Sequence, residues 1–232
     1  MPDADSGRRA PFRIPHSEFP IGHQAECWRP SGRPVIIGAV GFVGLSKRIG
    51  LWEKFVAREK VILAYSGGLD TSVAVKWISE KYDMDVITYT CDLGQGRDMQ
   101  AIKAKALETG AIEAVVEDTK NMFVDYFVWP SLMTGTMYEG KYPLATALGR
   151  PLIAHQMVRT AKEHGATAVA HGCTGKGNDQ VRFDVSFQTL APELKIIAPV
   201  REWKWTRTEE LQYAKDHGIQ VDATKQSIYS VD

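Results

Sequence analysis

The sequence predicts an α/β domain built on an open parallel sheet with helices on both faces. From residue 60 onward, apolar β-branched runs alternate with segments whose apolar residues recur at helical spacing. Glycine-rich turns follow several of the strand-like runs. At 232 residues, the chain is also long enough to bury a sizeable core. Such alternation favours parallel strands joined by right-handed helical crossovers.

The predicted elements follow one another along the chain as strand and helix in turn. We expect strands at Val61–Tyr65, Asp85–Thr90, Ala114–Glu117, Thr167–His171 and Lys195–Val200, and helices at Ser72–Tyr82, Asp98–Glu108, Asn121–Leu132, Pro151–Glu163 and Thr208–His217. Pro130 is expected to break the third helix, because proline removes a backbone donor. Gly135–Pro143 is predicted to be a loop, and Gly218 is a typical stop after a helix.

Composition excludes several classes of protein. Lys+Arg and Asp+Glu both number 28, so no overall positive field favours nucleic acid. Three widely spaced cysteines without CxxC spacing indicate a reducing compartment, and we expect the cytoplasm. The apolar run Pro34–Leu45 is shorter than the about 20 residues that span a bilayer, so no membrane partner is expected.

The chain divides by composition into two main parts. Residues 1–58 are rich in Pro, Arg and Ser without a sustained period, and we expect a poorly ordered N-terminal extension there. Residues 59–222 are predicted to form a nucleotide-binding domain. In the extension, Gly38, Gly41 and Gly44 have a spacing that differs from the GxGxxG dinucleotide fingerprint.

The stretch VILAYSGGLDTS, Val61–Ser72, predicts a phosphate-binding turn between a strand and a helix. The first backbone N–H groups of a helix have no partner within it and point at whatever lies ahead, which suits an anion. Gly67 and Gly68 would let the main chain approach phosphate oxygens. Hydroxyl donors come from Ser66, Thr71 and Ser72. The stretch fits neither the Walker pattern GxxxxGK[ST] nor GxGxxG.

Asp70 places a carboxylate beside the expected anion. At an effective dielectric near 20, two like charges about 4 Å apart repel by roughly 4 kcal/mol. We therefore expect Asp70 either to share a Mg²⁺ with the phosphates or to accept backbone N–H bonds as a helix cap. The alternative is that SGGLDT is an ordinary strand-to-helix connection with an aspartate cap.

The stretch HGCTGKGNDQVRF, His171–Phe183, carries charges of both signs in one turn. Arg182 suits a substrate carboxylate, and Asp179 suits a substrate ammonium. Thr174 and Asn178 can bond a second carboxylate, while Asn178 or Asp179 can cap the following helix. The alternative is a surface pair of Asp179 with Arg182 at i, i+3, which contributes only about 0.2–0.5 kcal/mol.

The stretch CDLGQG follows the second predicted strand. The short side chain of Cys91 leaves room for an adenine ring, although an ordinary loop would look the same. Nothing in the sequence marks Cys91 as a nucleophile. Ligands of open parallel sheets bind at the carboxyl ends of the strands where the strand order reverses. We therefore expect the loops after Tyr65, Thr90 and His171 to lie together.

Two levels of resemblance follow from these motifs. AYSGGLDTS resembles the SGGxD[ST] loop of the N-type ATP pyrophosphatases, which cleave ATP between its α and β phosphates; this implies an adenine-nucleotide alpha-hydrolase-like, Rossmann-like fold. With YTCDLGQ, YEGKYPLATALGRPLIA and HGCTGKGNDQVRF in the same order, the chain from Lys60 to its last residue resembles the argininosuccinate synthase family.

The resemblance implies a ligase that condenses citrulline with aspartate through citrullyl-AMP, with ATP and Mg²⁺ and no protein nucleophile or fixed protein metal site. It implies a homo-oligomer, a tetramer in full-length relatives. It assigns ATP to Ala64, Tyr65, Ser66, Gly67, Gly68, Leu69, Asp70, Thr71, Ser72, Cys91 and Gly172, aspartate to Thr174, Asn178 and Asp179, and citrulline to Tyr142, Asn178, Arg182 and Ser230.

Family members continue past the segment at which this sequence stops, so residues 223–232 are expected to begin a truncated synthetase domain. One alternative function is therefore an ATP-binding fragment without catalysis. Another is a tRNA-modifying relative that adenylates a base, but it would need a basic face and a catalytic cysteine pair. The neutral charge and scattered cysteines weigh against that reading.

Overall fold

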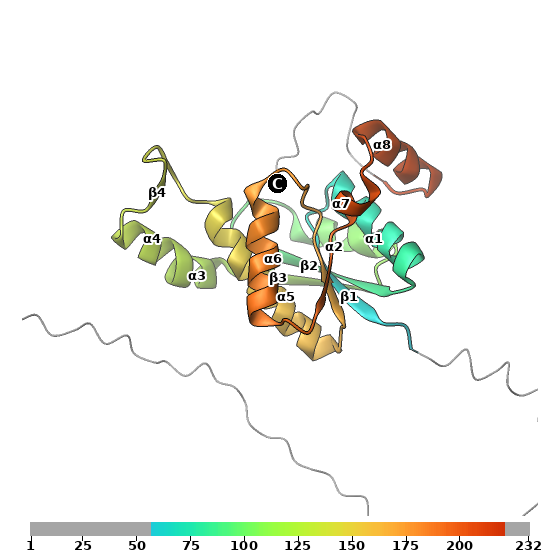
Figure 1. The fold of residues 1–232 in the computed structure, drawn as a ribbon, viewed down its shortest axis with the longest axis horizontal. Coiled ribbons are helices and arrows are strands. Elements are labelled where there is room, and N and C mark those ends of the chain that lie inside the picture. Colours follow the sequence, from blue (N-terminus) through green and yellow to red (C-terminus); the bar gives the residue numbers. More distant parts are fainter. Residues whose placement is uncertain (1–56, 221–232) are drawn as a thin grey trace, which may run out of the picture. The chain divides into compact units, whose positions relative to one another are not determined.

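The computed structural model describes residues 57–220, and its centre is a five-stranded parallel sheet of order β3-β2-β1-β6-β7 (Figure 1). The strands of this sheet are β1 (Lys60–Ala64), β2 (Asp85–Asp92), β3 (Glu113–Asp118), β6 (Ala168–Ala170) and β7 (Lys195–Ile197). The helices are α1 (Leu69–Tyr82), α2 (Met99–Thr109), α3 (Lys120–Phe123), α4 (Trp129–Met133), α5 (Thr146–His164), α6 (Asn178–Leu190), α7 (Pro199–Trp203) and α8 (Arg207–Asp216), with one π-helical turn, η4 (Val124–Val128).

Helices cover both faces of the sheet, as predicted. In β1, Val61 and Leu63 pack into one buried cluster with residues of α1 and α2, whereas Ile62 packs into a second cluster with residues of α5 and α6. This division follows from the period of two in a strand, which sends successive side chains to opposite faces. Strands buried on both faces read as continuous apolar runs, which explains the sequence VIL.

The strand order reverses between β1 and β6. The chain proceeds outward from β1 to β2 and β3 and then returns to place β6 on the other side of β1. A crevice opens at the carboxyl ends of two strands whose connections leave in opposite directions. The turns after β1 and β6 therefore border the place where this fold class binds its ligands.

Proline does not break the helix predicted around residue 130. The backbone stays helical from α3 through η4 to α4, with Pro130 in the first turn of α4. The preceding turn is widened, since the N–H of Trp129 donates to the carbonyl of Val124, five residues back. A π-helical turn of this kind changes the hydrogen-bond spacing just before the residue that lacks a donor.

Further differences from the predictions concern the loop at 135–143, helix α5 and strand β7. The expected loop at 135–143 contains a small antiparallel hairpin of β4 (Met137–Tyr138) and β5 (Tyr142–Pro143). Helix α5 begins at Thr146, five residues before the expected start at Pro151, and continues through this proline although its missing N–H removes one hydrogen bond of the helix. Strand β7 ends early because Pro199 begins α7, where a missing N–H costs nothing.

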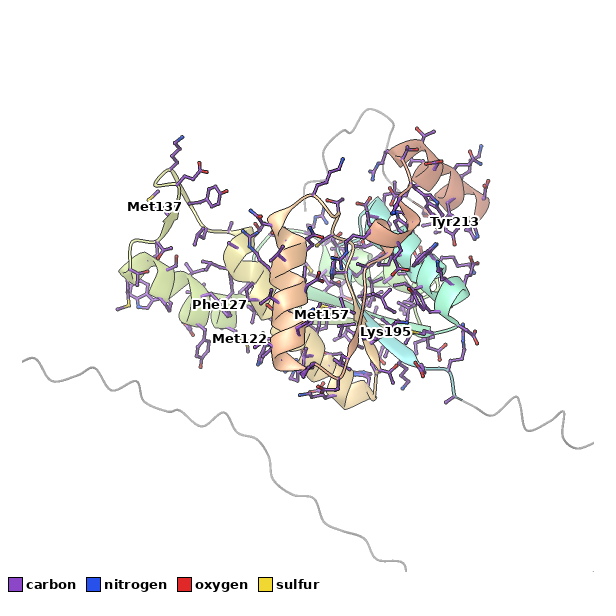
Figure 2. The ribbon with its side chains drawn as sticks, viewed as in Figure 1. Met122, Phe127, Met137, Met157, Lys195 and Tyr213 are labelled. Carbon is purple, nitrogen blue, oxygen red and sulfur yellow. The ribbon has the colours of Figure 1, made fainter. Side chains whose placement is uncertain are left out.

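Segments α3, α4 and β4 lie to one side of the sheet, on the left in Figure 1, and α8 lies on the opposite side next to α1. Figure 2 labels Met137 on the hairpin side and Tyr213 on the α8 side. Tyr213 packs against the cluster around α1. None of the helices within residues 57–220 is long and apolar enough to cross a membrane.

Some expectations fall outside the described part of the chain. These are the extension up to residue 56 and the start of a synthetase domain at 223–232, which includes Ser230.

Candidate nucleotide-binding site

The turn between β1 and α1 has the geometry of an anion-binding helix start. Gly67 has a φ of +79°, in the left-handed region that glycine adopts without strain. Gly68 is the N-cap residue of α1, and its carbonyl accepts the N–H of Ser72 at 3.1 Å. The N–H groups between these two residues therefore have no acceptor within the helix. This confirms the predicted order of strand, glycine turn and helix, with α1 beginning three residues earlier than expected.

The hydroxyl groups of the turn divide into two sets. Ser66 Oγ lies 3.3 Å from Thr71 Oγ1 and 3.3 Å from the backbone nitrogen of Gly68, which places both hydroxyls at the turn itself. Ser72 is completely buried, with its hydroxyl 3.0 Å from Tyr65 Oη. The prediction that the hydroxyl of Ser72 faces an anion is therefore corrected: buried on the inner side of α1, this group links the helix to the strand.

Asp70 pairs with an arginine far away in sequence. Arg207 Nη1 of α8 lies 2.8 Å from Asp70 Oδ1, across 137 positions of chain. No side-chain bond caps α1, so the predicted role of Asp70 as a helix cap is wrong. The carboxylate is one position beyond the first helical residue, and the arginine satisfies its charge instead.

Glu210 completes this group of charges. Its side chain is 9% exposed, its Oε2 lies 3.5 Å from Arg207 Nη1, and its Oε1 has no hydrogen-bond partner. Burial, followed by repulsion from Asp70, raises the pKa of Glu210 to about 8, although Arg207 acts in the opposite direction. The first turn of α1 is thus flanked by two carboxyl groups that share one guanidinium.

The turn after β6 meets the start of α1. A Cβ atom at Gly172 would stand 3.0 Å from Thr71 Cγ2 and 4.0 Å from Asp70 Cβ. Only a glycine lets the two segments come this close without a shift. This contact confirms the central geometric expectation, namely that the SGGLDTS and HGCTGKGND stretches lie together at the switch point.

The loop after β2 closes the site from the other side. Arg97 Nη1 donates to the carbonyl oxygen of Ser66 at 2.7 Å. In the same loop, Leu93 Cδ1 would stand 3.1 Å from a Cβ at Gly149, near the start of α5. The three loops expected to cluster therefore do so.

Cys91 is buried at the carboxyl end of β2, in the cluster that faces α5 and α6. Burial raises the pKa of its thiol. A thiol of raised pKa forms little thiolate, so this environment does not favour a nucleophile.

A buried network supports the turn after β6. His171 is fully buried, and its Nε2 lies 2.9 Å from Asp184 Oδ1 of α6. The backbone N–H of Cys173 donates to His171 Nδ1 at 3.3 Å, so the Nε2–H is the group that donates to Asp184. Arg201 of α7 in turn binds Asp184 at 2.7 Å. These bonds connect the backbone of the turn to α6 and α7.

At the start of α6, Asp179 binds two arginines. Arg150 Nε of α5 lies 3.1 Å from Asp179 Oδ2, and Arg182 pairs with Oδ1 of the same carboxylate. The i, i+3 pair considered from the sequence is therefore present, but it is partly buried and has a third member. Thr174 and Asn178 are exposed at the same turn. The N-cap of α6 is Gly177 without a side-chain bond, so the predicted cap by Asn178 or Asp179 is wrong.

Sequence reasoning missed Arg97, Arg150 and Arg207. Arg150 belongs to the stretch YEGKYPLATALGRPLIA, from which the resemblance assigned Tyr142 only, so the sequence did offer this arginine as a candidate. Arg207 had no local signal, because its partner is 137 positions away. Tyr142, the predicted citrulline residue of that stretch, lies in β5 opposite Tyr138.

The strand order and the turns at its switch point define the class: an open α/β nucleotide-binding domain of the Rossmann-like, adenine-nucleotide alpha-hydrolase-like kind. A family model described as "Arginosuccinate synthase N-terminal HUP domain" matches residues 60–220. The chain belongs to the argininosuccinate synthase family.

Three curated relatives indicate how much of the family's length is present. Argininosuccinate synthases of Oceanobacillus iheyensis and Brevibacillus brevis are 58% and 54% identical to this chain over 177 residues, which are 76% of the chain and 42% of each relative. The argininosuccinate synthase of Limosilactobacillus reuteri is 56% identical over 177 residues, 76% of the chain and 43% of the relative. The chain thus spans about two fifths of the length of these relatives.

Proposed function

We propose that this chain binds ATP with the turn Ala64–Thr71, Cys91 and Gly172, and that it supplies the nucleotide site for the synthesis of argininosuccinate. The observation that carries the proposal is the approach of Gly172 to Thr71 and Asp70 at the switch point. In this contact the helix N-terminus and the second glycine turn are direct neighbours. The names of the relatives supply the reaction.

The proposed reaction is a ligation in two steps. The ureido oxygen of citrulline attacks the α-phosphate of ATP, and pyrophosphate leaves. The amine of aspartate then displaces AMP, which gives argininosuccinate. All three substrates bring their own reactive groups, so the protein contributes position and charge rather than a nucleophile. The raised pKa of the Cys91 thiol agrees with this division of roles.

We assign the amino-acid substrates to the start of α6. Asp179 suits the ammonium of aspartate, with Thr174 and Asn178 for its carboxylate, and Arg182 and Asn178 suit citrulline together with Tyr142 and Ser230. The shared carboxylate of Asp179 supports this assignment, since Arg150 and Arg182 hold it in place beside the turn. A charge fixed from two sides loses little freedom when a substrate binds.

Asp70 fits a magnesium ion that arrives with the nucleotide. Mg²⁺ is usually held by one or two carboxylates together with substrate phosphates and water. Asp70 is the one acidic residue in the first turn of α1 and is partly exposed, and its carboxylate would be shared between the ion and Arg207. When bound, the ion would neutralise phosphate charge; the residues of this chain would hold and orient the triphosphate.

We further propose a cytoplasmic location, which the free thiols of Cys91 and Cys173 support. The resemblance also implies that the chain assembles into a homo-oligomer, and this stays a prediction.

The test combines binding with turnover. The 232-residue chain is titrated with MgATP by calorimetry and is then incubated with ATP, citrulline and aspartate while pyrophosphate is assayed. ATP binding with pyrophosphate release that depends on citrulline would support the full proposal. ATP binding without release would favour the alternative of a nucleotide-binding domain that does not turn over by itself. Absence of ATP binding would contradict both.

A further inference from the structure

The phosphate turn carries no cation of its own. Between Ala64 and Ser72 the only charged side chain is that of Asp70, which is negative, whereas Walker-type loops contain a lysine that reaches the phosphates. A helix N-terminus stabilises a nearby anion only weakly at an exposed site. A polyphosphate therefore needs positive charge from elsewhere in the fold.

Two arginines contact this turn, one from the loop after β2 and one from helix α8. Arg97, in the loop after β2, donates from Nη1 to the carbonyl oxygen of Ser66 at 2.7 Å. Arg207, in the first turn of α8, donates from Nη1 to Asp70 Oδ1 at 2.8 Å. Both side chains are exposed, so a ligand can reach them. They contact the two ends of the segment that begins α1.

Two carboxyl groups, those of Asp70 and Glu210, hold Arg207 beside the phosphate turn. Glu210 is nine-tenths buried beside it, and the Oε1 of Glu210 has no hydrogen-bond partner. The carboxyl group of Glu210 lies 3.5 Å from Arg207 and restricts where its guanidinium can lie. Arg207 is thereby kept over the first turn of α1.

We propose that Arg97 and Arg207 bind the pyrophosphate end of the nucleotide, and that Arg207 also neutralises Asp70 so that the turn accepts an anion. This rests on the proposed ATP site and adds to it the two residues that supply positive charge. A guanidinium presents a planar fork of donors that matches phosphate oxygens. The five N–H donors of an arginine also allow one bond to the protein and others to a ligand.

The experiment compares three probes on four proteins. ATP, inorganic pyrophosphate and AMP are titrated into the 232-residue chain and into its Arg97→Gln, Arg207→Gln and Lys215→Gln variants. Lys215 is a matched control, since it is an exposed cation on the same helix as Arg207 but in its last turn. Circular dichroism and thermal unfolding check the fold, and Arg207→Lys replaces Arg207→Gln if that variant does not fold.

We expect each arginine variant to bind ATP and pyrophosphate at least tenfold more weakly and AMP within twofold of the parent. The control should bind all three probes unchanged. Equal losses for AMP and ATP, or ATP affinities within twofold of the parent in both arginine variants, would overturn this inference and leave the proposed ATP site standing. A parent chain that binds none of the probes would overturn the proposed function and this inference with it.

Discussion

Gly172 lies so close to Thr71 that a Cβ atom would stand 3.0 Å from Thr71 Cγ2. Thr71 lies in the first turn of α1 and Gly172 in the turn after β6, about a hundred positions apart in sequence but next to the ends of the neighbouring strands β1 and β6. Thr71 is buried and its hydroxyl contacts Ser66, so it has little room to give way. This contact joins the turn after β6 to the start of α1 within the candidate site.

Gly172→Ala should therefore damage both stability and nucleotide binding. The added methyl group pushes on Thr71, and overpacking of this kind costs about 1–3 kcal/mol in the free energy of unfolding. ATP affinity should fall as Thr71 moves. Gly177→Ala is the control, because a Cβ there meets nothing within 4 Å and its φ is −111°. Urea unfolding and ATP titration would show the difference; equal behaviour of the two variants would refute the prediction.

Gly67→Ala tests the left-handed backbone of the phosphate turn. With a φ of +79°, an alanine costs about 1–2 kcal/mol or forces the turn to rearrange. Gly165→Ala introduces the same kind of strain at the end of α5, where φ is +63°. Both variants should lose stability in urea unfolding, but only Gly67→Ala should lose ATP binding in calorimetry. Retention of full ATP affinity by Gly67→Ala would remove this turn from the site.

His171 should make stability depend on pH below its ordinary pKa. Burial lowers the pKa of His171 in the folded chain, against the opposing bond to Asp184. Below about pH 6.5 the unfolded chain binds a proton that the folded chain refuses, so stability falls as pH falls. His171→Gln should weaken this dependence between pH 7 and pH 5 in urea unfolding, even though it destabilises the protein overall. His155→Gln removes an exposed imidazole on α5 and should leave the dependence intact; the opposite ranking would contradict the prediction.

Cys173 should react slowly despite its place in a glycine-rich turn. Burial raises the pKa of its thiol to about 11, so little thiolate exists near neutral pH. Iodoacetamide at pH 8, followed by mass spectrometry of peptides, should label Cys173 at least tenfold faster in urea than in the folded chain. Similar rates in both conditions would show that the thiol is not held as the structure has it.

Arg182→Gln should weaken the binding of citrulline far more than the binding of ATP. Arg182 lies at the start of α6 and contacts Asp179, whereas the phosphate turn belongs to α1. Arg159→Gln is the control, since Arg159 pairs with Glu117 on β3. The measurement is the citrulline concentration dependence of pyrophosphate release, or citrulline binding in the presence of ATP. Equal losses of citrulline and ATP would identify Arg182 as a structural residue.

The sequence alone predicted the fold class and the positions of the turns, because both depend on local patterns. The apolar run at Val61–Leu63 marks a strand buried on both faces, and the glycines after it mark a turn that other residues cannot form. Alternation of strands and helices then leaves few topologies, and the rule for open parallel sheets brings the three loops together.

Tertiary structure alone decided the partners of the charges. Asp70 was open to a metal or a cap from the sequence, but α8 brings Arg207 to it across 137 positions. The sequence suggested that the hydroxyl of Ser72 contacts a ligand, but the packing of α1 places it in the core against Tyr65. Local sequence determines where strands, turns and helices form. Which charged side chains pair depends on how those elements pack together, because the two partners are far apart in sequence.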